Sequence, residues 1–189
     1  MESVDYLNTT NKYTLDLSLW LDDYDDIYSD FDSRNYLKRR VSADFITELR
    51  TALKNKNEKI NDLVLLVPQD KRDTHKEKQI IKNLNNYFNA QLSSFSSNYN
   101  KYLKKGIFLF ITALALMIIN SVVSFELHSN LLAAIIRIAL EPSGWFLVWI
   151  AFDILYYDLQ RLKKEKYFFR ELTTIQIIFQ SSDLYPVNE

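Results

Sequence analysis

Three segments of the chain carry the hydrophobic pattern of β-strands. Apolar and polar residues alternate along KYTLDLSLW, residues 12–20, which predicts a strand with one buried face. The run DLVLLVP, residues 62–68, is continuously apolar up to its proline and is typical of a strand covered on both faces. Alternation returns in TTIQIIFQ, residues 173–180, and predicts a third strand near the C-terminus.

Other segments repeat their apolar residues every three or four positions, as α-helices do. SADFITELRTALKNKN, residues 42–57, predicts an amphipathic helix with Ser42 as its N-cap. A longer pattern begins near Asp73 and meets no Pro or Gly before Gly106, so we expect this helix to continue into the apolar segment that follows. Residues 158–172 predict another helix. The order strand, helix, strand at the N-terminal end predicts a parallel pair of strands.

GIFLFITALALMIINSVVSF, residues 106–125, has the pattern of a transmembrane helix. Its 20 residues carry no formal charge, and at 1.5 Å per residue they cross a hydrocarbon core of about 30 Å. A second apolar stretch, residues 131–157, is interrupted by Pro142. It forms either one kinked span, or a short helix over 131–140 followed by a second piece over 144–157. Because fourteen residues are too few to cross a bilayer, we expect the single kinked span.

Basic residues flank the two spans on one side only. KYLKKG before the first span holds three Lys and RLKKEKYFFR after the second holds five Lys or Arg, whereas FELHSN between the spans holds none. This asymmetry predicts a multi-pass membrane protein with both termini in the cytoplasm. The N-terminal sequence MESVDYLNTTNKYT does not have the pattern of a cleavable signal peptide.

A single C-terminal strand is not stable by itself, so we expect it to complete the sheet begun near the N-terminus. The predicted fold class is an α+β membrane protein, with a small cytoplasmic α/β domain of about three strands, a long helical stalk and an inserted two-helix transmembrane hairpin. The predicted boundaries are residues 1–92 for the cytoplasmic domain and the start of the stalk, 93–105 for the rest of the stalk, 106–157 for the hairpin, and 158–189 for the returning helix and strand.

The composition of the 189 residues excludes several classes of site. Lys and Arg (23) balance Asp and Glu (24), so the net charge of -1 gives no overall attraction to nucleic acid or to acidic lipid. The chain has no Cys, two His and two Gly. It therefore cannot build a disulfide, a thiolate or His-based zinc site, a P-loop or a dinucleotide fingerprint. We expect no enzymatic activity, no metal and no other cofactor.

The segment DDYDDIYSDFD, residues 22–32, holds six aspartates. It lacks the Gly and the closing Glu of a calcium loop. We favour a structural role, in which the aspartates face water or cap backbone groups. The apolar side chains would then pack on the sheet as a short helical turn: Tyr24, Ile27, Tyr28 and Phe31. Binding of an ion or ligand is the first alternative, and catalysis by Asp22, Asp26 and Asp30 around a metal is the second.

Four basic residues follow in RNYLKRR: Arg34, Lys38, Arg39 and Arg40. Guanidinium groups beside a helix that begins after Ser42 can hold phosphate through bidentate hydrogen bonds and the helix dipole. The hypothesis is a ligand-binding site for a nucleotide or a short oligonucleotide. The alternative is a solvated basic surface paired with the neighbouring aspartates, and the segment offers few aromatic rings on which bases could stack.

Polar residues inside the apolar stretches are the sharpest functional signal. Arg137 and Glu141 are four residues apart, so on a helix they share a face and can pair. Each ion costs roughly 2.5 to 3.5 kcal/mol at the bilayer centre, and two helices cannot enclose the pair. Either the pair lies near the outer interface, or several subunits surround it. We assign a pore or oligomer interface to Arg137, Glu141, Asn120 and Asp153, with a plain interfacial position as the alternative for Asp153.

Four motifs occur in order along most of the chain: DDYDDIYSDFDSR, SADFITEL, LVLLVP and GWFLVWIAFDILYYDLQRLKKE. Together they resemble a widespread bacterial family of uncharacterised two-span membrane proteins, which have an acidic and aromatic SDFDPR segment and a Trp-rich second span. In this chain Ser33 stands in place of the proline of that segment. The resemblance implies the architecture given above and no reaction.

These patterns lead to one preferred function and one alternative. The preferred function is a homo-oligomeric inner-membrane effector, with four copies as the working number, that opens a ligand-gated pore or disrupts the membrane under control of its cytoplasmic domain. By analogy, such proteins include effectors of antiphage defence under nucleotide control. The expected partners are membrane lipid, further copies of the chain, a nucleotide or oligonucleotide signal, and a protein encoded in the same operon. The alternative is a membrane-tethered scaffold or interaction module without transport activity.

Overall fold

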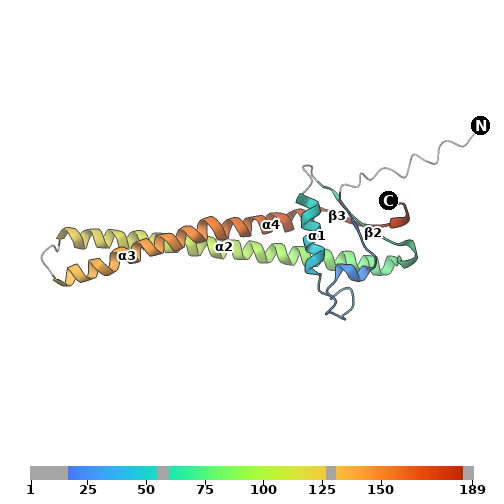
Figure 1. Ribbon diagram of the computed structural model, residues 1–189, viewed down its shortest axis with the longest axis horizontal. Helices are drawn as coiled ribbons and strands as arrows, with labels where there is room; N and C mark the ends of the chain where they lie inside the picture. Colours follow the sequence, from blue (N-terminus) through green and yellow to red (C-terminus); the bar gives the residue numbers. More distant parts are fainter. Residues whose placement is uncertain (1–16, 55–59, 127–130, 185–189) are drawn as a thin grey trace, which may run out of the picture. The chain divides into compact units, whose positions relative to one another are not determined.

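Figure 1 shows the computed structural model of the protein, which describes residues 17–54, 60–126 and 131–184. The described chain is mostly helical and contains a small three-stranded parallel sheet. It divides into two compact units: Met1–Ala90 with Phe168–Glu189, and Gln91–Tyr167. The first unit draws on both ends of the sequence, and the second is the segment between them.

The sheet of the first unit has the strand order β1-β2-β3: β1 (Leu17–Trp20), β2 (Asp62–Val67) and β3 (Gln176–Ser181). Both neighbouring pairs are parallel, with Leu17 opposite Leu63 and Leu63 opposite Ile177. This arrangement confirms the predicted parallel pair and the return of the C-terminal strand to the sheet. The central strand is buried from Leu63 to Val67, as its continuously apolar sequence predicted.

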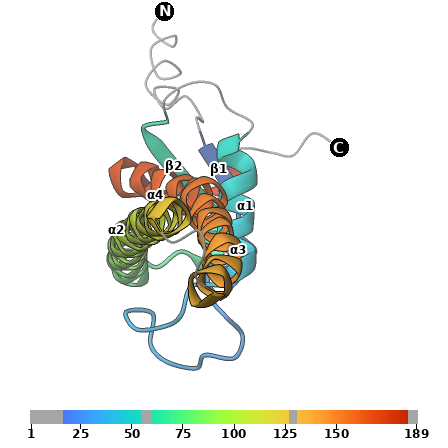
Figure 2. The ribbon, with the colours of Figure 1, turned by 90° about the vertical axis from the view of Figure 1, so that its left-hand side faces the viewer.

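Helix α1 (Ala43–Lys54) connects β1 to β2 and lies beside β1 (Figure 2). The Ser42 hydroxyl accepts hydrogen bonds from the backbone N–H groups of Asp44 and Phe45, at 3.1 and 3.2 Å. This geometry confirms Ser42 as the N-cap, a role worth about 1 kcal/mol. The last residues of the predicted helix, 55–57, lie outside the described residues.

The third strand begins later than the sequence pattern predicts. Helix α4 (Leu159–Thr174) extends through the first residues of the alternating segment, and β3 starts only at Gln176. The hydroxyls of Thr173 and Thr174 each donate to a helix carbonyl three residues earlier, at 2.8 Å, so both side chains are satisfied within the last helical turn. The first part of the predicted N-terminal strand, residues 12–16, lies outside the described residues.

Long helices build the second unit. α2 (Thr74–Glu126) is one helix of 53 residues without a break at Gly106, which confirms the predicted continuation. α3 (Leu131–Asp153) passes through Pro142 as a single helix, so the expectation of one helical segment is confirmed and the two-piece alternative is wrong. A π-helical turn, η3 (Ile154–Asp158), joins α3 to α4.

Small residues line the contact between α2 and α3, which lie side by side in both ribbon views. Each helix buries two of them seven positions apart: Gly106 and Ala113 on α2, Gly144 and Ala151 on α3. A Cβ atom added at Gly144 would lie 3.0 Å from Cγ of Met117 on α2, and one added at Gly106 would lie 2.6 Å from Cδ2 of Leu155 in η3, the turn that follows α3. The two helices therefore approach each other in the manner of membrane bundles built on small residues.

Two helical segments are long and apolar enough to span a membrane. The first lies within Thr74–Phe125, with a mean hydropathy of 2.4, and the second within Ala134–Thr174, with a mean hydropathy of 1.5. Only 11% and 17% of these apolar stretches are buried. Within the described chain they are therefore not core helices, and large apolar side chains such as Phe108, Ile118 and Phe146 are exposed along them.

Candidate functional site

The acidic segment of the first unit folds around one 3-10 turn, η1 (Tyr24–Ile27). Oδ2 of Asp26 accepts hydrogen bonds from the backbone N–H groups of Asp22 and Asp23, at 2.7 and 3.0 Å. This aspartate therefore satisfies backbone donors at the start of the turn, as the structural interpretation of the segment predicted.

The apolar side chains of the acidic segment divide into two groups. Three of them are buried in the first unit: Tyr24, Ile27 and Tyr28. Phe31, in contrast, is 96% exposed, so its predicted packing on the sheet is wrong. The reason is a separate turn, closed by a hydrogen bond of 3.0 Å from the Asp32 N–H to the Ser29 carbonyl, which carries Phe31 away from the core.

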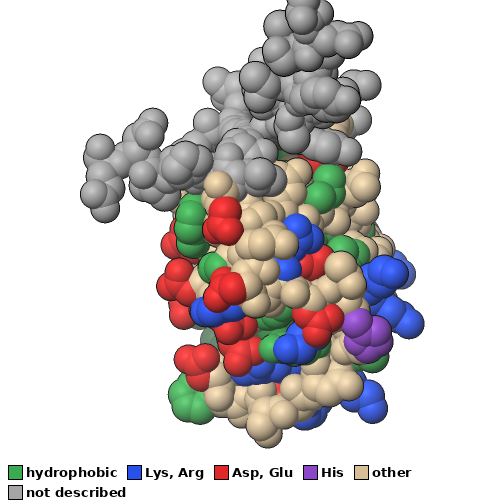
Figure 3. Space-filling view, turned by 90° about the vertical axis from the view of Figure 1, so that its right-hand side faces the viewer, with side chains coloured by type: hydrophobic (Ala, Val, Ile, Leu, Met, Phe, Trp, Pro, Cys, Tyr) green, Lys and Arg blue, Asp and Glu red, His purple; other side chains and the backbone are tan. Residues whose placement is uncertain are grey.

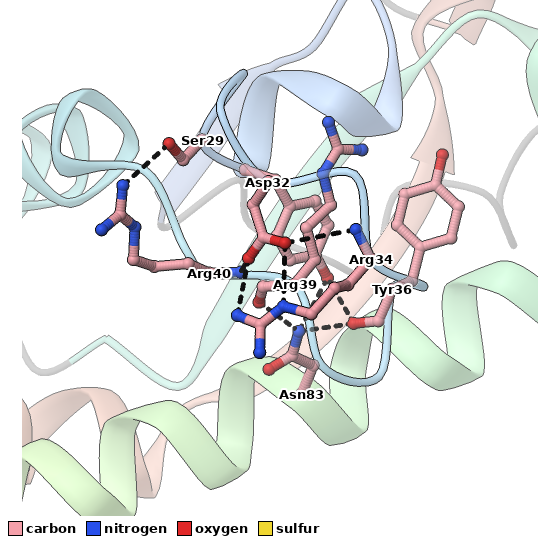
Figure 4. Close-up of polar contacts among 8 residues, drawn as sticks. Ser29, Asp32, Arg34, Tyr36, Arg39, Arg40 and Asn83 are labelled. Carbon is pink, nitrogen blue, oxygen red and sulfur yellow. Dashed lines mark hydrogen bonds and ion pairs between the residues drawn. The ribbon is translucent and has the colours of Figure 1, made fainter.

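Asp32 braces the loop that follows the acidic segment (Figure 4). Its carboxylate accepts hydrogen bonds from Nε and Nη2 of Arg34, at 2.9 and 2.8 Å, and from the backbone N–H groups of Arg34 and Arg40, at 3.2 and 2.7 Å. These donors, first among them the Arg34 guanidinium, hold the pKa of the Asp32 carboxyl well below its usual range. The carboxylate is thus committed to the loop and is not free to hold a ligand.

Arg39 is enclosed by the same segment. Its Nη1 atom donates to Oδ1 of Asp25 at 2.6 Å, and its guanidinium carbon lies 5.5 and 6.0 Å from the ring centroids of Tyr28 and Tyr36. The Tyr36 hydroxyl also donates to Oδ1 of Asp25, at 3.0 Å. Burial and this carboxylate together raise the pKa of Tyr36 to about 12. The ion pair is reinforced by cation–π contacts, each worth about 0.5 to 2 kcal/mol.

Asn83 fastens this loop to α2. Its Nδ2 atom donates to the backbone carbonyls of Tyr36 and Arg39, the latter at 2.9 Å (Figure 4). Asn83 is buried beside Ile80 and Leu84, which are also buried. The sequence interpretation missed this residue, and the signal that marks it is a polar side chain next to the apolar stripe of a helix.

A second polar cluster joins η1, α2 and β3. The Tyr24 hydroxyl donates to Oε1 of Glu77 at 3.0 Å and accepts the Asp73 N–H at 2.8 Å. Arg72 binds both carboxylate oxygens of Glu77, at 2.9 and 3.0 Å, and donates to the Phe179 carbonyl at 3.2 Å. Burial is the main reason why the pKa of Tyr24 is raised to about 12. The start of α2 is therefore tied to both the acidic segment and the last strand.

The four basic residues of the predicted ligand site differ in their surroundings. Arg34 and Arg39 are held by aspartates of the same segment, as the structural alternative proposed. Arg40 is exposed and donates from Nη2 to the Ser29 hydroxyl at 3.2 Å, and Lys38 is exposed. Arg34 is exposed as well but is paired with Asp32, so within the described residues Lys38 and Arg40 are the exposed members of the set that are not held by an aspartate side chain, and the ligand-binding role of all four stays a prediction.

Acidic side chains do not gather into a metal site in the part of the chain that the structure describes, where no group of three His, Cys, Asp or Glu residues could hold a metal ion. Acidic and basic side chains are interspersed on the face of the molecule in Figure 3. A mixed surface of this kind lacks the single-sign field that attracts a nucleic-acid backbone.

The hairpin formed by α3 and the apolar part of α2 contains the other candidate site. Nη1 of Arg137 donates to the Ser124 hydroxyl on α2 at 3.3 Å, and within the described hairpin no ion pair joins Arg137 to Glu141. Nε of Arg137 and Oδ1 of Asn120 are buried and have no hydrogen-bond partner among the described residues. Glu141 is exposed, as is Asp153 at the end of α3. The i, i+4 pairing that the sequence allows is therefore replaced by a contact across the hairpin.

The positions of Arg137 and Glu141 along the apolar segment of α2 follow from contacts between the two helices. Arg137 faces Ser124 and Gly144 faces Met117, so Glu141 lies between these two levels. At 1.5 Å per residue, Glu141 is about 7 Å and Arg137 about 13 Å from the midpoint of residues 106–125. If a bilayer were centred on that segment, the carboxylate would lie inside its hydrocarbon core and the guanidinium near its edge.

Comparisons of the chain with known protein families, with curated proteins and with solved structures find no significant match. No family assignment follows from them, and the resemblance to two-span membrane proteins stays a prediction. What the protein does has to be inferred from its own residues.

Proposed function

We propose that this chain is an integral protein of a bacterial inner membrane whose hairpin assembles in several copies. The assembly opens a pore or disrupts the bilayer, under control of an α/β domain in the cytoplasm. Support comes from the two apolar helices, whose side chains are left exposed by the rest of the described chain. Lipid is the environment in which such surfaces are stable.

The proposal depends mainly on the exposed position of the Glu141 carboxylate along the apolar hairpin. A single hairpin would leave this carboxylate facing lipid at a depth where an ionised group costs roughly 2.5 to 3.5 kcal/mol. Arg137 does not neutralise it, because its guanidinium turns to Ser124 on the other helix. Neighbouring copies, or a water-filled passage between them, would remove this cost. The unpartnered buried atoms of Arg137 and Asn120 add further polar groups to the same half of the hairpin.

The cytoplasmic domain would act as the sensor. Lys38 and Arg40 are the exposed cations to which an anionic signal, such as a nucleotide or a short oligonucleotide, would bind. α2 begins in the first unit and ends in the second, so a change at its start would reach the hairpin through one continuous helix. A role in antiphage defence, a tetrameric state and a partner encoded in the same operon remain parts of this proposal.

Ion flux through liposomes tests the pore. The full-length protein is reconstituted, and release of a trapped dye is followed with and without nucleoside triphosphates and oligonucleotides of two to four residues. We expect Glu141→Gln and Arg137→Ala to reduce release at least tenfold. Ser143→Ala is the matched control, because the Ser143 hydroxyl only bonds the Ala139 carbonyl of its own helix, at 2.7 Å. Release that is absent in the wild type, or equal in Glu141→Gln, would overturn the proposal.

One observation favours a second candidate, a membrane-tethered interaction module. Arg34 and Arg39 form ion pairs with Asp32 and Asp25, so the first unit has fewer guanidinium groups available to a ligand than its sequence suggests. In this case the hairpin only anchors the domain. Replacing residues 106–157 with an unrelated two-span hairpin would leave the cellular role intact in a tether and abolish it in a pore.

A further inference from the structure

The loop between η1 and α1, residues 29–40, is closed at its base by a short antiparallel ribbon. Tyr28 pairs with Val41 across the ribbon. The Ser29 N–H donates to the Arg40 carbonyl at 3.0 Å, and the Ser42 N–H donates to a carbonyl on the opposite leg at 2.9 Å. We call this loop the braced loop, because its interior is fixed as well as its base.

Three groups hold the interior of the braced loop. The carboxylate of Asp32 accepts four hydrogen bonds from within the loop. Oδ1 of Asn35 accepts the Leu37 N–H at 2.7 Å, and Asn83 binds two loop carbonyls from α2. A loop with this many internal hydrogen bonds keeps one conformation, so the side chains that it exposes are presented in a fixed arrangement.

The braced loop exposes a large apolar side chain that the first unit does not need for folding. Phe31 is 96% exposed and Leu37 is 39% exposed. Aromatic side chains are enriched among the residues that anchor protein interfaces, and a rigid loop can present one in a fixed position. Core packing does not explain this side chain. Phe31 lies in the turn closed between Ser29 and Asp32, whereas the buried aromatic residues Tyr24 and Tyr28 belong to η1 and its end.

Charges of both signs remain next to this anchor after the internal pairs are made. Asp32 neutralises Arg34, and Asp25 neutralises Arg39. Asp30 and Lys38 are exposed, and the exposed Arg40 guanidinium donates to the Ser29 hydroxyl. The exposed groups of the braced loop therefore comprise an aromatic side chain, one carboxylate and two cations.

We propose that the braced loop is a contact between cytoplasmic domains of two copies of this chain. A patch that carries an acid and a base around an apolar centre is complementary to itself after a two-fold rotation. Phe31 packs against the same loop of the second copy, and Asp30 of each copy meets Lys38 of the other. An anionic partner such as lipid headgroups or a nucleic-acid backbone would pair with the two cations but would leave the Asp30 carboxylate and the Phe31 ring without a complementary group.

This contact rests on the proposed function in two respects, since copies of the chain must meet and Lys38 also belongs to the proposed signal site, but it does not require the hairpin to conduct. The chain has no cysteine, so Ser33→Cys places a single thiol on the exposed part of the loop. Full-length protein in lipid nanodiscs or detergent is treated with a short bis-maleimide. We expect a covalent dimer on a denaturing gel. Glu48→Cys, at an exposed position of α1, is the matched control and should give at least fivefold less dimer.

Charge exchange in the Ser33→Cys background gives the decisive comparison. We expect Asp30→Lys alone and Lys38→Asp alone each to lower the yield of dimer at least fivefold, and both changes in the same chain to restore it. Phe31→Ser should also lower the yield without changing the thermal unfolding midpoint, because the side chain is exposed. A yield that is the same in all variants, or no recovery in the doubly exchanged chain, would overturn the contact. Loss of dye release in Glu141→Gln with normal crosslinking separates the two proposals.

Discussion

The Tyr24 hydroxyl donates a hydrogen bond of 3.0 Å to Oε1 of Glu77, although 53 residues separate the two in sequence. Glu77 lies in the first turn of α2 and is also bound by Arg72, which reaches the Phe179 carbonyl on β3. One small buried cluster thus joins the acidic segment, the sheet and the helix that continues into the hairpin. In the proposed function, a signal bound by the cytoplasmic domain would act on α2 through this cluster.

Removal of the Tyr24 hydroxyl should destabilise the first unit. In Tyr24→Phe, the Asp73 N–H loses its acceptor and the Glu77 carboxylate loses one donor. A buried polar group left without a partner costs about 1 to 3 kcal/mol. We expect the thermal unfolding midpoint of the full chain, followed by near-ultraviolet circular dichroism, to fall by several degrees. Tyr156→Phe removes an exposed hydroxyl and should leave the midpoint unchanged; equal midpoints for both variants would argue against the cluster.

Stability at high pH should reflect the buried tyrosines. The pKa values of Tyr24 and Tyr36 are raised to about 12, and burial raises the pKa of Tyr28 as well. An unfolded chain loses these protons near pH 10, so the raised values stabilise the fold below about pH 10, and this contribution is lost as the pH rises towards 12. Tyrosinate absorbance should show a late component that is smaller in Tyr24→Phe. Titration of all tyrosines in one step near pH 10 would contradict this expectation.

Stability at low pH should depend on Asp32. Its pKa is depressed by the hydrogen bonds from Arg34 and then by the Arg40 N–H. The stabilisation is therefore complete above the ordinary carboxyl pKa of about 3.9 and is lost as the pH falls below that value towards the depressed one. Asp32→Asn should flatten the acid limb of the stability curve. Asp30→Asn, which changes an exposed carboxylate of the same loop, should leave the acid limb as it is in the wild type.

The elements that could be predicted from the sequence are those whose patterns are local. The apolar run of β2 and the unbroken periodicity of α2 each extend over several residues or turns, so the buried face is visible without knowledge of the partner. The Ser42 cap was found for the same reason, since its donors are two and three residues away. Boundaries were less certain, because Thr173 and Thr174 suit the end of a helix as well as the start of a strand.

Pairings between distant residues could not be predicted in the same way. The sequence places Arg137 and Glu141 on one face of a helix, but it does not show that Ser124 on the other helix is within 3.3 Å of the guanidinium. Phe31 shows a related difficulty, because its apolar character suggested burial whereas the turn at Asp32 exposes it. In both cases the outcome depends on how segments far apart in sequence, or a single turn, are arranged in space.

Close packing at Gly106 should contribute to the stability of the hairpin. A Cβ atom at this position would meet Cδ2 of Leu155 at 2.6 Å and Cγ2 of Ile154 at 3.2 Å. Cγ of Leu155 would lie at 2.8 Å and is not the far end of its side chain, so the whole Leu155 side chain has to shift and Gly106→Ala should itself lower stability. Gly106→Leu adds a volume that cannot be accommodated and should cost about 1 to 3 kcal/mol. Thermal unfolding of the full chain in detergent measures the difference between the two variants.

Ala115→Leu is the matched control for Gly106→Leu, because Ala115 lies on the same helix and is exposed. Its added side chain meets no neighbour in the hairpin, so we expect the unfolding midpoint of this variant to equal that of the wild type. If Gly106→Leu also left the midpoint unchanged, the close contact of α2 with the η3 turn would be wrong. The depth of Glu141 would keep its basis, because it is derived from the contacts of Arg137 with Ser124 and of Gly144 with Met117.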